Sequence, residues 1–292
     1  MEHIKQRYIL VTGAHGQLGW ELSKILNPDE AVFVDRDELD ITNAEAVNKY
    51  LSKTKFTHIV NCAAYTAVDK AESDEEVCRK VNAEGVKNIV EAIKGYKTRL
   101  IHISTDFVFD GKKDEPYTEE DEVNALSVYG RTKAEGEEFI LRDRSDAIII
   151  RTGWLYSAHG NNFVKTMLRL ASGGKRLKVI NDQQGTPTWA ADLASAIKTI
   201  IYSDEWRQGI YHFSNMGQTS WYGLAEEIFK NKYPEAHLEP CTTEEYATAA
   251  KRPAYSVLDK SKIVKIYNIQ IPIWQDSLKN CLANIDLSHL NH

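Results

Sequence analysis

Between residues 8 and 151, five short apolar segments rich in β-branched residues alternate with segments of helical periodicity. Short runs of this kind predict buried strands, and their alternation with helices is typical of a parallel sheet covered by helices on both faces. The expected strands cover residues 8–12, 31–34, 57–62, 99–104 and 146–151. The sequence therefore predicts an α/β protein with a doubly wound parallel sheet of the Rossmann type.

Three glycines, Gly13, Gly16 and Gly19, follow the first expected strand, and a helical pattern begins directly after them. Glycines between a strand and a helix let the backbone approach a pyrophosphate closely, and the helix amides then face the phosphates. A plain tight turn is the alternative, but the strand and helix on either side supply the required context. Ala63 and Ala64, after the third strand, are small enough to leave room for the same ligand. We therefore expect a dinucleotide cofactor here.

The end of the second expected strand contains Asp35 and Arg36, at the place where such proteins distinguish their cofactors. Asp35 favours NAD, because a carboxylate accepts a hydrogen bond from the ribose 2′-hydroxyl. Arg36 favours NADP, because a guanidinium pairs with a 2′-phosphate in a charge-assisted bond worth about 1.5 to 3 kcal/mol. Repulsion from exposed carboxylates is screened to about 1 kcal/mol or less, so we expect NADPH to be preferred and NADH to be accepted. Asp40 fits an adenosine contact or a plain turn equally well.

The chemistry is expected near Thr105 and Asp106, just past the carboxyl end of the fourth strand, where ligands bind to open parallel sheets. Tyr129 and Lys133 stand four residues apart in an expected helix over 128–142, so both lie on one face. A nearby cation stabilises a phenolate, so Lys133 and a nicotinamide cation would lower the pKa of Tyr129 and make it a usable acid. Thr105 is placed to donate a second hydrogen bond to the same carbonyl oxygen. The Tyr-x-x-x-Lys spacing alone also arises by chance and depends on this context.

Two helix starts are predicted from charged and capping residues. Thr42 and Glu45 match the capping box of a helix that runs through Leu51. The acidic run 69–76 is expected to open a long helix that continues to Ile93. We interpret its carboxylates as a solvated first turn rather than as a metal site.

The alternation of strands and helices changes after Thr152, which predicts two parts. Residues 1–153 are expected to form a dinucleotide-binding domain. Residues 154–292 are expected to form mainly a smaller α/β substrate-binding lobe, with segments at about 180–205 returning to the first domain. Basic residues of this lobe, among them Arg252, fit a solvated surface individually. As a set around a cleft they would grip a diphosphate.

Composition excludes several classes of partner. The chain of 292 residues has 36 Lys and Arg against 42 Asp and Glu, a net charge of −6, so no basic field attracts nucleic acid or an anionic membrane. No apolar run approaches the ~20 residues of a membrane span, and the first apolar run is too short for a signal peptide. The four cysteines show no metal-binding spacing and fit reduced thiols. We expect a cytoplasmic protein.

Several motifs together resemble the extended short-chain dehydrogenase/reductases, and within them the reductases of dTDP-linked 4-keto-6-deoxy sugars. The resemblance covers nearly the whole chain. It rests on Gly13-x-x-Gly16-Gln17-Leu18-Gly19-Trp20-Glu21-Leu22, Asn61-x-Ala63-Ala64-x-Thr66-Ala67-Val68-Asp69-Lys70-Ala71-Glu72, Ser104-Thr105-Asp106-x-Val108-Phe109, Tyr129-Gly130-x-Thr132-Lys133, Gly160-Asn161-Asn162-Phe163-x-Lys165-Thr166-Met167-Leu168 and Val179-Ile180-Asn181-Asp182-Gln183. The last two motifs discriminate best, because the glycine turn and the Tyr-Lys pair occur across the superfamily.

The resemblance implies roles for individual residues. Tyr129 would be the acid, Lys133 would hold the nicotinamide ribose and tune Tyr129, and Thr105 would assist at the substrate carbonyl. The implied cofactor contacts, added to Gly13, Gly16, Gly19, Asp35, Arg36, Ala63 and Lys133, are Gln17, Leu18, Asp40, Ile41, Ala64 and Tyr65. The implied substrate contacts, added to Thr105, Tyr129 and Arg252, are Thr66, Val68, Asp106, Trp154 and Asn162.

Some similar proteins form homodimers around a magnesium ion held by glutamates. Glu21 matches one such position, but Ala191 stands where another glutamate is expected. A homodimer is therefore an expectation of the resemblance, whereas this departure argues against bound Mg²⁺, and we assign no metal ligand.

Three functions compete at this point. The first is NAD(P)H-dependent reduction of the dTDP-linked 4-keto-6-deoxy sugar dTDP-4-dehydro-L-rhamnose to dTDP-L-rhamnose, for rhamnose-containing polysaccharides. The second is a nucleotide-sugar epimerase, which shares the Tyr-Lys chemistry but keeps its NAD bound. The third is a non-catalytic regulatory subunit of the same fold, which the presence of Thr105, Tyr129 and Lys133 disfavours.

Overall fold

A six-stranded sheet lies at the centre of the computed structural model, which describes residues 7–144, 146–174 and 176–286. The strand order is β10-β5-β4-β3-β1-β2, and all neighbours are parallel. The strands are β1 (Ile9–Thr12), β2 (Ala31–Val34), β3 (His58–Asn61), β4 (Arg99–Thr105), β5 (Ile148–Thr152) and β10 (Gly209–His212). The predicted parallel sheet and its five strands are confirmed. The edge strand β10 was not identified from the sequence.

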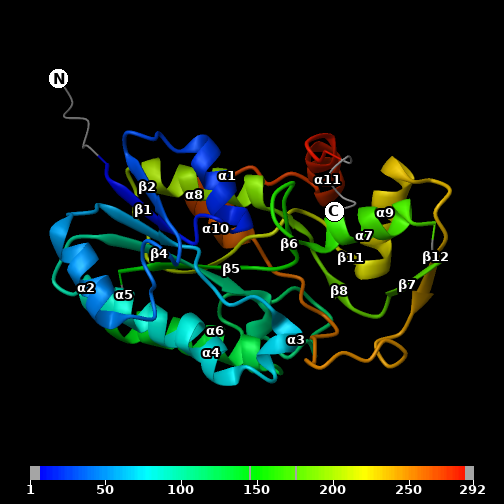
Figure 1. Ribbon diagram of the computed structural model, residues 1–292, viewed down its shortest axis with the longest axis horizontal. Coiled ribbons are helices and arrows are strands. Elements are labelled where there is room, and N and C mark those ends of the chain that lie inside the picture. Colours follow the sequence, from blue (N-terminus) through cyan, green and yellow to red (C-terminus); the bar gives the residue numbers. More distant parts are fainter. Residues whose placement is uncertain (1–6, 145, 175, 287–292) are drawn as a thin grey trace.

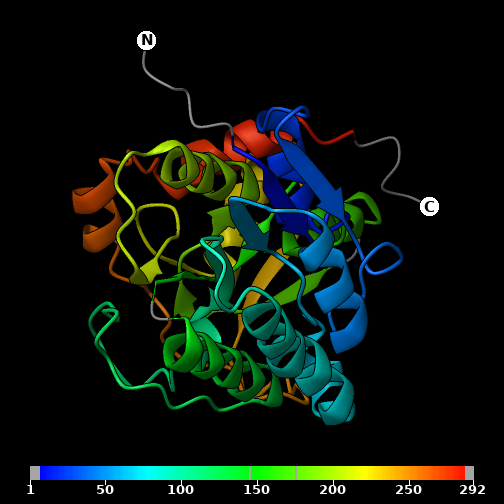
Figure 2. The ribbon, with the colours of Figure 1, turned by 90° about the vertical axis from the view of Figure 1, so that its left-hand side faces the viewer.

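Helices cover both faces of this sheet (Figure 1). One face is covered by α1 (Gln17–Ile25), α8 (Ala190–Tyr202) and α10 (Ser261–Tyr267), and the other by α2 (Ala44–Lys53), α5 (Gly85–Ala92) and α6 (Val128–Asp143). Successive strand residues alternate between the two apolar cores: Ile9 and Val11 pack on the α1 side, and Leu10 packs on the α2 side. Figure 2 shows the sheet between the two helical layers.

The strand order reverses between β1 and β3. From β1 the chain moves outward to β2, and it then crosses back to β3, β4 and β5 on the other side. The loops that follow β1 and β3 therefore diverge at the carboxyl edge and leave a crevice between them. Open α/β sheets bind ligands at this topological switch point.

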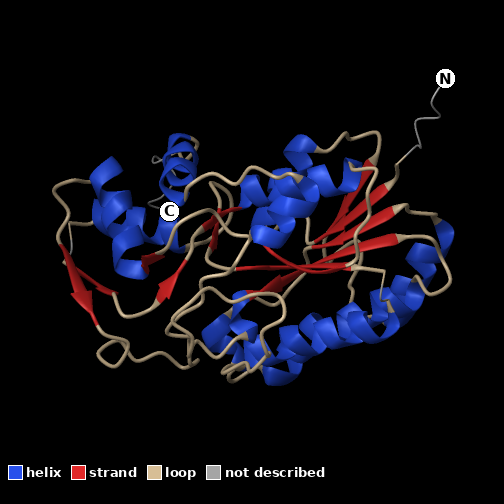
Figure 3. Ribbon diagram, turned by 180° about the vertical axis from the view of Figure 1, so that it is seen from behind, coloured by secondary structure: helices blue, strands red, loops and turns tan. Residues whose placement is uncertain are grey.

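A second group of elements packs beside the carboxyl edge around a separate apolar core formed by α7 (Phe163–Ser172), α9 (Trp221–Lys232) and α11 (Trp274–Ala283). Three two-stranded sheets accompany them (Figure 3). They pair β6 (Leu155–Tyr156) with β9 (Thr188–Trp189), β7 (Leu177–Ile180) with β12 (Leu238–Cys241), and β8 (Gln184–Gly185) with β11 (Thr219–Ser220). Although α8 and β10 follow α7 in the chain, both return to the central sheet.

The predicted long helix from the acidic run to Ile93 is confirmed from Glu75 to Ala92, where helical segments follow one another without a break, but residues 72–74 separate it from a short helix at the start of the run. The chain forms α3 (Val68–Ala71), α4 (Glu75–Arg79), the π-helical turn η1 (Lys80–Glu84) and then α5. Asn82 in the π-helical turn accepts from the Tyr65 N–H at 2.8 Å and donates to the Tyr65 carbonyl at 3.1 Å. The irregular turn therefore holds the loop after β3, a tertiary contact that helical periodicity does not reveal.

The predicted capping box of α2 is wrong. Asn43 is the N-cap and accepts from the Ala46 N–H at 3.0 Å. The Thr42 hydroxyl instead donates to Asp40 at 2.7 Å. Both residue types are good caps, and the turn that Asp40 forms decides between them.

Cys62, Cys78, Cys241 and Cys281 carry free thiols, and all but Cys62 are buried. Within the described ranges, none of the helices combines the length and the apolar composition that crossing a bilayer requires.

Candidate functional site

A cavity of about 1230 Å³ lies along the carboxyl edge of the sheet. It collects every residue that the sequence analysis assigned to a cofactor or a substrate. These are Gly13, Gly16, Gln17, Leu18, Gly19, Asp35, Arg36, Asp40, Ile41, Ala63, Ala64, Tyr65, Thr66, Val68, Thr105, Asp106, Tyr129, Lys133, Trp154, Asn162 and Arg252. The structure therefore brings the predicted residues together, while the role of each stays a prediction.

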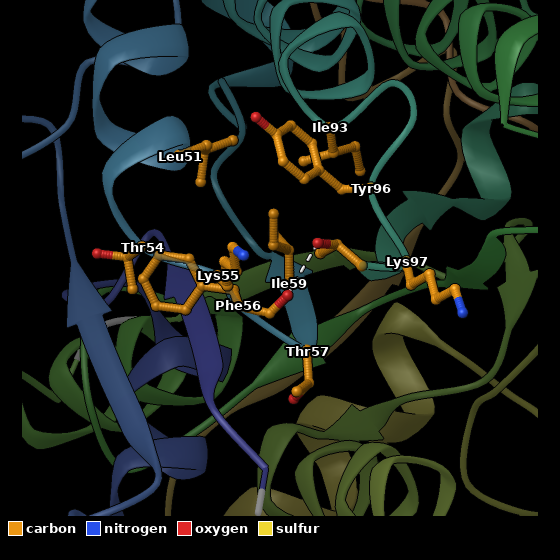
Figure 4. Close-up of a pocket in the computed structure, with 10 residues that line it drawn as sticks. Leu51, Thr54, Lys55, Phe56, Thr57, Ile59, Ile93, Tyr96 and Lys97 are labelled. Carbon is orange, nitrogen blue, oxygen red and sulfur yellow. Dashed lines mark hydrogen bonds between the residues drawn. The ribbon is translucent and has the colours of Figure 1, made fainter.

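A smaller cavity of about 220 Å³ lies at the opposite edge, before the amino ends of β3 and β4 (Figure 4). Its wall is largely apolar, with Leu51, Phe56 and Ile59 among the lining residues, and Thr98 donates there to the Phe56 carbonyl at 2.8 Å. None of the predicted site residues lines it, and ligands of parallel sheets bind at the other edge. The large cavity is the candidate site.

The glycine turn passes close to the loop after β3. Gly13 has a φ of +69°, and a Cβ atom there would lie 2.7 Å from the Ala63 nitrogen. Both the conformation and the space therefore require glycine. Gly16 caps α1 without any side-chain hydrogen bond, so the first amides of the helix remain open to an anionic ligand in the cavity.

Asp35 accepts from the backbone N–H groups of His15 and Arg36, both at 2.8 Å. Its carboxylate thus holds the glycine turn in addition to lining the cavity. The Arg36 side chain is 82% exposed, with Nε 3.6 Å from Oδ2 of Asp40. Burial raises the pKa of Asp40, but bonds from Thr42 and the charge of Arg36 outweigh this effect and hold it below its usual value. The exposed Arg36 side chain therefore has room to turn toward a phosphate, whereas both carboxylates already have partners.

Tyr129 lies in the first turn of α6, which Ser127 caps by accepting from the Gly130 N–H at 3.2 Å. Burial raises the pKa of Tyr129 to about 12, hydrogen bonding with Thr105 opposes this, and the charge of Asp106 adds to it. The phenol is therefore protonated at neutral pH. This differs from the lowering expected from Lys133 together with a nicotinamide cation, because burial dominates in the protein alone.

Lys133 lies one helical turn further on and is 2% exposed. Its Nζ donates to the Ile103 carbonyl at 2.5 Å and lies 3.3 Å from Nε2 of His102. Burial lowers the pKa of Lys133 to about 8, and the Glu137 charge and two thiols oppose this. Glu137 is itself paired with Arg151 at 2.6 Å, so it only partly compensates the lysine.

Asp106 is 2% exposed, and its Oδ1 accepts from the Thr105 hydroxyl at 3.1 Å. Among the described residues, its buried Oδ2 has no hydrogen-bond partner. Burial raises the pKa of Asp106 to about 6, and the nearby Ser256 and Thr105 hydroxyls oppose this shift. Asp106 lines the cavity, and its carboxyl group is therefore a candidate contact for a ligand.

Trp154 has a φ of +50°, a strained conformation for a bulky residue. Its ring stacks on Trp221, with centroids 3.6 Å apart and an angle of 7°. Phe163 lies 4.7 Å from the Trp221 ring. Trp221 lines the same cavity but was missed from the sequence, because no local pattern links the start of α9 to Trp154.

Asn162 connects the glycine turn to α7. Its Nδ2 donates to Oε1 of Gln17 at 3.0 Å and to the Ser157 carbonyl at 2.8 Å, and its Oδ1 caps α7 by accepting from the Lys165 N–H. Gln17 in turn donates to the Leu155 carbonyl at 3.4 Å. The amide groups of Asn162 and Gln17 are thus engaged within the protein while both residues line the cavity.

Arg252 reaches the cavity from the last part of the chain. It donates through Nη1 and Nη2 to the two carboxylate oxygens of Asp69, at 3.0 and 2.6 Å. Asp69 also accepts from the Ala250 N–H at 3.1 Å. These bonds lower the pKa of Asp69, the Arg252 bond being the largest cause.

Glu21, the residue that the resemblance relates to magnesium, is 5% exposed. Its carboxylate accepts from the Ser157 hydroxyl at 2.6 Å and from Nζ of Lys24 at 3.3 Å. Ala191, in the first turn of α8, offers no oxygen ligand. Among residues 7–144, 146–174 and 176–286, no three His, Cys, Asp or Glu side chains gather in a way that could hold a metal ion.

Comparison with known families gives one match that spans nearly the whole chain. The model of the RmlD substrate binding domain matches residues 7–287. The match includes the glycine turn, the Tyr129 helix and the elements around α7, α9 and α11.

Individual relatives agree with this match. A dTDP-4-dehydrorhamnose reductase of Aggregatibacter actinomycetemcomitans is 43% identical over 94% of this chain and 98% of the relative. The crystal structure of a dTDP-4-dehydrorhamnose reductase of Clostridium acetobutylicum superposes with a TM-score of 0.90 at 44% identity, covering 94% of this chain and 98% of that one. A Bacillus anthracis reductase of the same name, in complex with NADP, also has a TM-score of 0.90, at 37% identity over 95% and 99% of the two chains.

Proposed function

The chain belongs to the RmlD substrate binding domain family, and from this premise we propose that it is an NADPH-dependent enzyme that reduces dTDP-4-dehydro-L-rhamnose (dTDP-6-deoxy-L-lyxo-4-hexulose) to dTDP-L-rhamnose. The product serves rhamnose-containing polysaccharides. Relatives named dTDP-4-dehydrorhamnose reductase, at 43% and 44% identity, support the assignment. The observation that carries it is that Thr105, Tyr129 and Lys133 line the same cavity as the glycine turn.

Reduction of a ketone adds a hydride to the carbonyl carbon and a proton to its oxygen. NADPH supplies the hydride when bound. Tyr129 supplies the proton from its hydroxyl, and the Thr105 hydroxyl turns from Asp106 to donate a hydrogen bond to the same oxygen. The raised pKa of Tyr129 keeps its phenol protonated before the reaction. The proton is transferred once negative charge develops on the substrate oxygen.

The residues at the switch point fit a nicotinamide dinucleotide. The close approach at Gly13 and the uncapped amides of α1 suit a pyrophosphate. Asp35, Arg36 and Asp40 lie where the adenosine end would reach. Lys133 would bind the nicotinamide ribose, and the crystallised relative with bound NADP supports this choice of cofactor.

The substrate would enter between the sheet edge and the elements around α7, α9 and α11. We assign residues 1–153 to the cofactor and residues 154–292 mainly to the sugar nucleotide, with the α8 region belonging to the first part. Separate apolar cores on the two sides support this division. Thr66, Val68, Asp106 and Trp154 would meet the substrate, and Arg252 would meet its diphosphate.

The proposal places the enzyme in the cytoplasm, where its free thiols stay reduced. It includes a homodimer, which light scattering of the purified chain tests, and it omits magnesium because Glu21 is already bonded to Ser157 and Lys24.

The decisive experiment mixes the purified chain alone with NADPH and the keto sugar nucleotide and follows NADPH absorbance and product together. We expect one NADPH consumed for each sugar reduced, and a rate lower by about 10² to 10⁴ with the Tyr129→Phe variant. A sugar product without net NADPH consumption would identify an epimerase. Activity that appears only when another enzyme is added would identify a regulatory subunit.

A further inference from the structure

A buried histidine lies directly beneath the lysine of the site. His102, in the middle of β4, is 0% exposed. Its Nε2 lies 3.3 Å from Nζ of Lys133, and its Nδ1 lies 3.0 Å from Nδ2 of Asn61 at the end of β3. The imidazole therefore connects the lysine to the neighbouring strand.

The hydrogen bonds of Asn61 fix the direction of this connection. The Thr12 hydroxyl donates to Oδ1 of Asn61 at 2.7 Å, so Nδ2 of Asn61 faces the ring. An amide nitrogen only donates, so Nδ1 of His102 accepts, and the proton of the neutral ring is on Nε2, which faces Lys133. This N–H can donate to Lys133 only when the lysine is the neutral amine, because an ammonium group has no lone pair.

The surroundings keep the imidazole neutral. Burial, and then the charge of Lys133, hold the pKa of His102 well below its usual value. The titratable groups that face Lys133 are His102 on β4, Glu137 on α6, Cys62 after β3 and Cys78 on α4. Glu137 is bonded to Arg151 and Ser104. Within the described part of the chain, His102 is thus the one side chain that hydrogen-bonds the lysine amine.

We propose that His102 is a positioning residue for the reduction: anchored by Asn61 through Nδ1, it lies against the Lys133 nitrogen at the cofactor and donates to it from Nε2 when the lysine is the neutral amine. The role of Lys133 itself rests on the proposed function. Burial lowers the pKa of Lys133 to about 8, and a donor beside its nitrogen would further stabilise the neutral amine.

Two substitutions separate the contribution of Nε2, which faces Lys133, from that of Nδ1, which faces Asn61. His102→Gln places an amide near the position of Nε2 and keeps the reach to Lys133. His102→Asn places an amide near Nδ1, keeps the contact with Asn61 and loses the lysine. His58 provides a matched control, because it is also a buried histidine but lies at the amino end of β3, opposite the edge that lines the large cavity. The His58→Asn variant therefore measures the general cost in stability of replacing a buried histidine by asparagine.

The first readouts are the dissociation constant for NADP⁺, from a fluorescence titration without turnover, and the pH dependence of kcat. For His102→Asn we expect binding weakened and kcat lowered, each about tenfold to a hundredfold. We also expect the fall of kcat at high pH, which reports the titration of Lys133, to move to higher pH by about one unit. This is the size of effect that the loss of one hydrogen bond produces. For His102→Gln, the dissociation constant and kcat should stay within about threefold of the parent values, and the fall of kcat at high pH should not shift. His58→Asn should change the melting temperature only.

Equal losses in the Gln and Asn variants, with no shift in the fall of kcat at high pH, would mean that His102 only fills space and would overturn the proposal. The second readout needs no activity and separates this proposal from the proposed function. ¹⁵N-histidine NMR of the parent, with the His102 signal assigned from His102→Gln, should show a neutral ring protonated at Nε2 from about pH 5.5 to 9. A ring that titrates near neutrality, or one that is protonated at Nδ1, would contradict the proposed donor even if the enzyme is an active reductase.

Discussion

Arg252 donates hydrogen bonds to both carboxylate oxygens of Asp69, at 3.0 and 2.6 Å. This pair joins the last part of the chain to the start of α3 beside the cavity that Arg252 lines. Arg252 was predicted to bind the substrate diphosphate, yet here it is engaged by a carboxylate of the protein. Asp69 is 46% exposed in its side chain and Arg252 is 19% exposed, so solvent weakens the pair. A diphosphate, with more charge than one carboxylate, would compete for the guanidinium.

This competition predicts opposite effects for the two partners. Arg252→Ala should raise KM for the sugar nucleotide by about tenfold to a hundredfold, because charge-assisted bonds are lost. Asp69→Asn should lower KM by up to about fivefold, since an exposed ion pair is worth at most about 1 kcal/mol. Steady-state kinetics measure both effects, with the exposed neighbour Lys251→Ala as the control. If both variants raised KM alike, the pair would be a structural link between the two parts.

Asp106→Asn should stabilise the protein at pH 7. The pKa of Asp106 is raised to about 6 when folded and is ~3.9 when unfolded. The folded state therefore holds its proton more tightly and loses stability as pH rises from about 4 to about 6. The carboxylate costs roughly 3 kcal/mol above pH 6, from about two units at 1.4 kcal/mol each. The difference in unfolding free energy between variant and parent should reach this size at pH 7 and vanish at pH 4.

Denaturant unfolding at the two pH values measures this difference, with exposed Asp204→Asn as the control. A variant that is no more stable than the parent at pH 7 would show that the unpartnered Oδ2 of Asp106 is solvated or protonated in a way that removes the cost.

Tyr129→Phe should remove the proton donor and leave the cofactor site intact. General acid catalysis contributes about 10² to 10⁴ in rate, so kcat should fall by that factor. The dissociation constant for NADPH should stay within about twofold, because the ring and its edge contact with Phe107 remain. Reduction at a rate close to that of the parent enzyme would show that Tyr129 only packs in the site.

Arg36→Ala should discriminate between the two nicotinamide cofactors. Loss of a guanidinium–phosphate contact should raise KM for NADPH by roughly tenfold to a hundredfold and barely change KM for NADH. The exposure of Arg36 and its loose contact with Asp40 leave it able to turn toward a 2′-phosphate. NADH serves as the internal control, and equal losses with both cofactors would assign Arg36 to the loop or to the adenine.

The sheet could be predicted from the sequence because its signals are local. Each strand is a short apolar run, and Gly13 is required by the turn in which it lies. The π-helical turn inside the helix after the acidic run could not be predicted, because it accompanies the hydrogen bonds of Asn82 to Tyr65, a residue on another loop. Helical periodicity carries no information about such contacts.

The site was predictable to the extent that its residues lie in recognisable motifs. The partners that tune them are distant in sequence: His102 beneath Lys133, Trp221 against Trp154, and Asp69 on Arg252. The pKa of Tyr129 was expected to fall, but burial of the phenol raises it, and burial depends on the packing of several elements.

The most direct test of the central claim follows the hydride itself. The purified chain is incubated with NADPH deuterated at nicotinamide C4, on the face that is transferred, and with dTDP-4-dehydro-L-rhamnose, and the sugar product is examined by NMR and mass spectrometry. The account predicts dTDP-L-rhamnose with one deuterium at C4 of the sugar and one NADP⁺ formed for each product molecule. A sugar without deuterium, or deuterium retained in unconsumed NADPH, would contradict it.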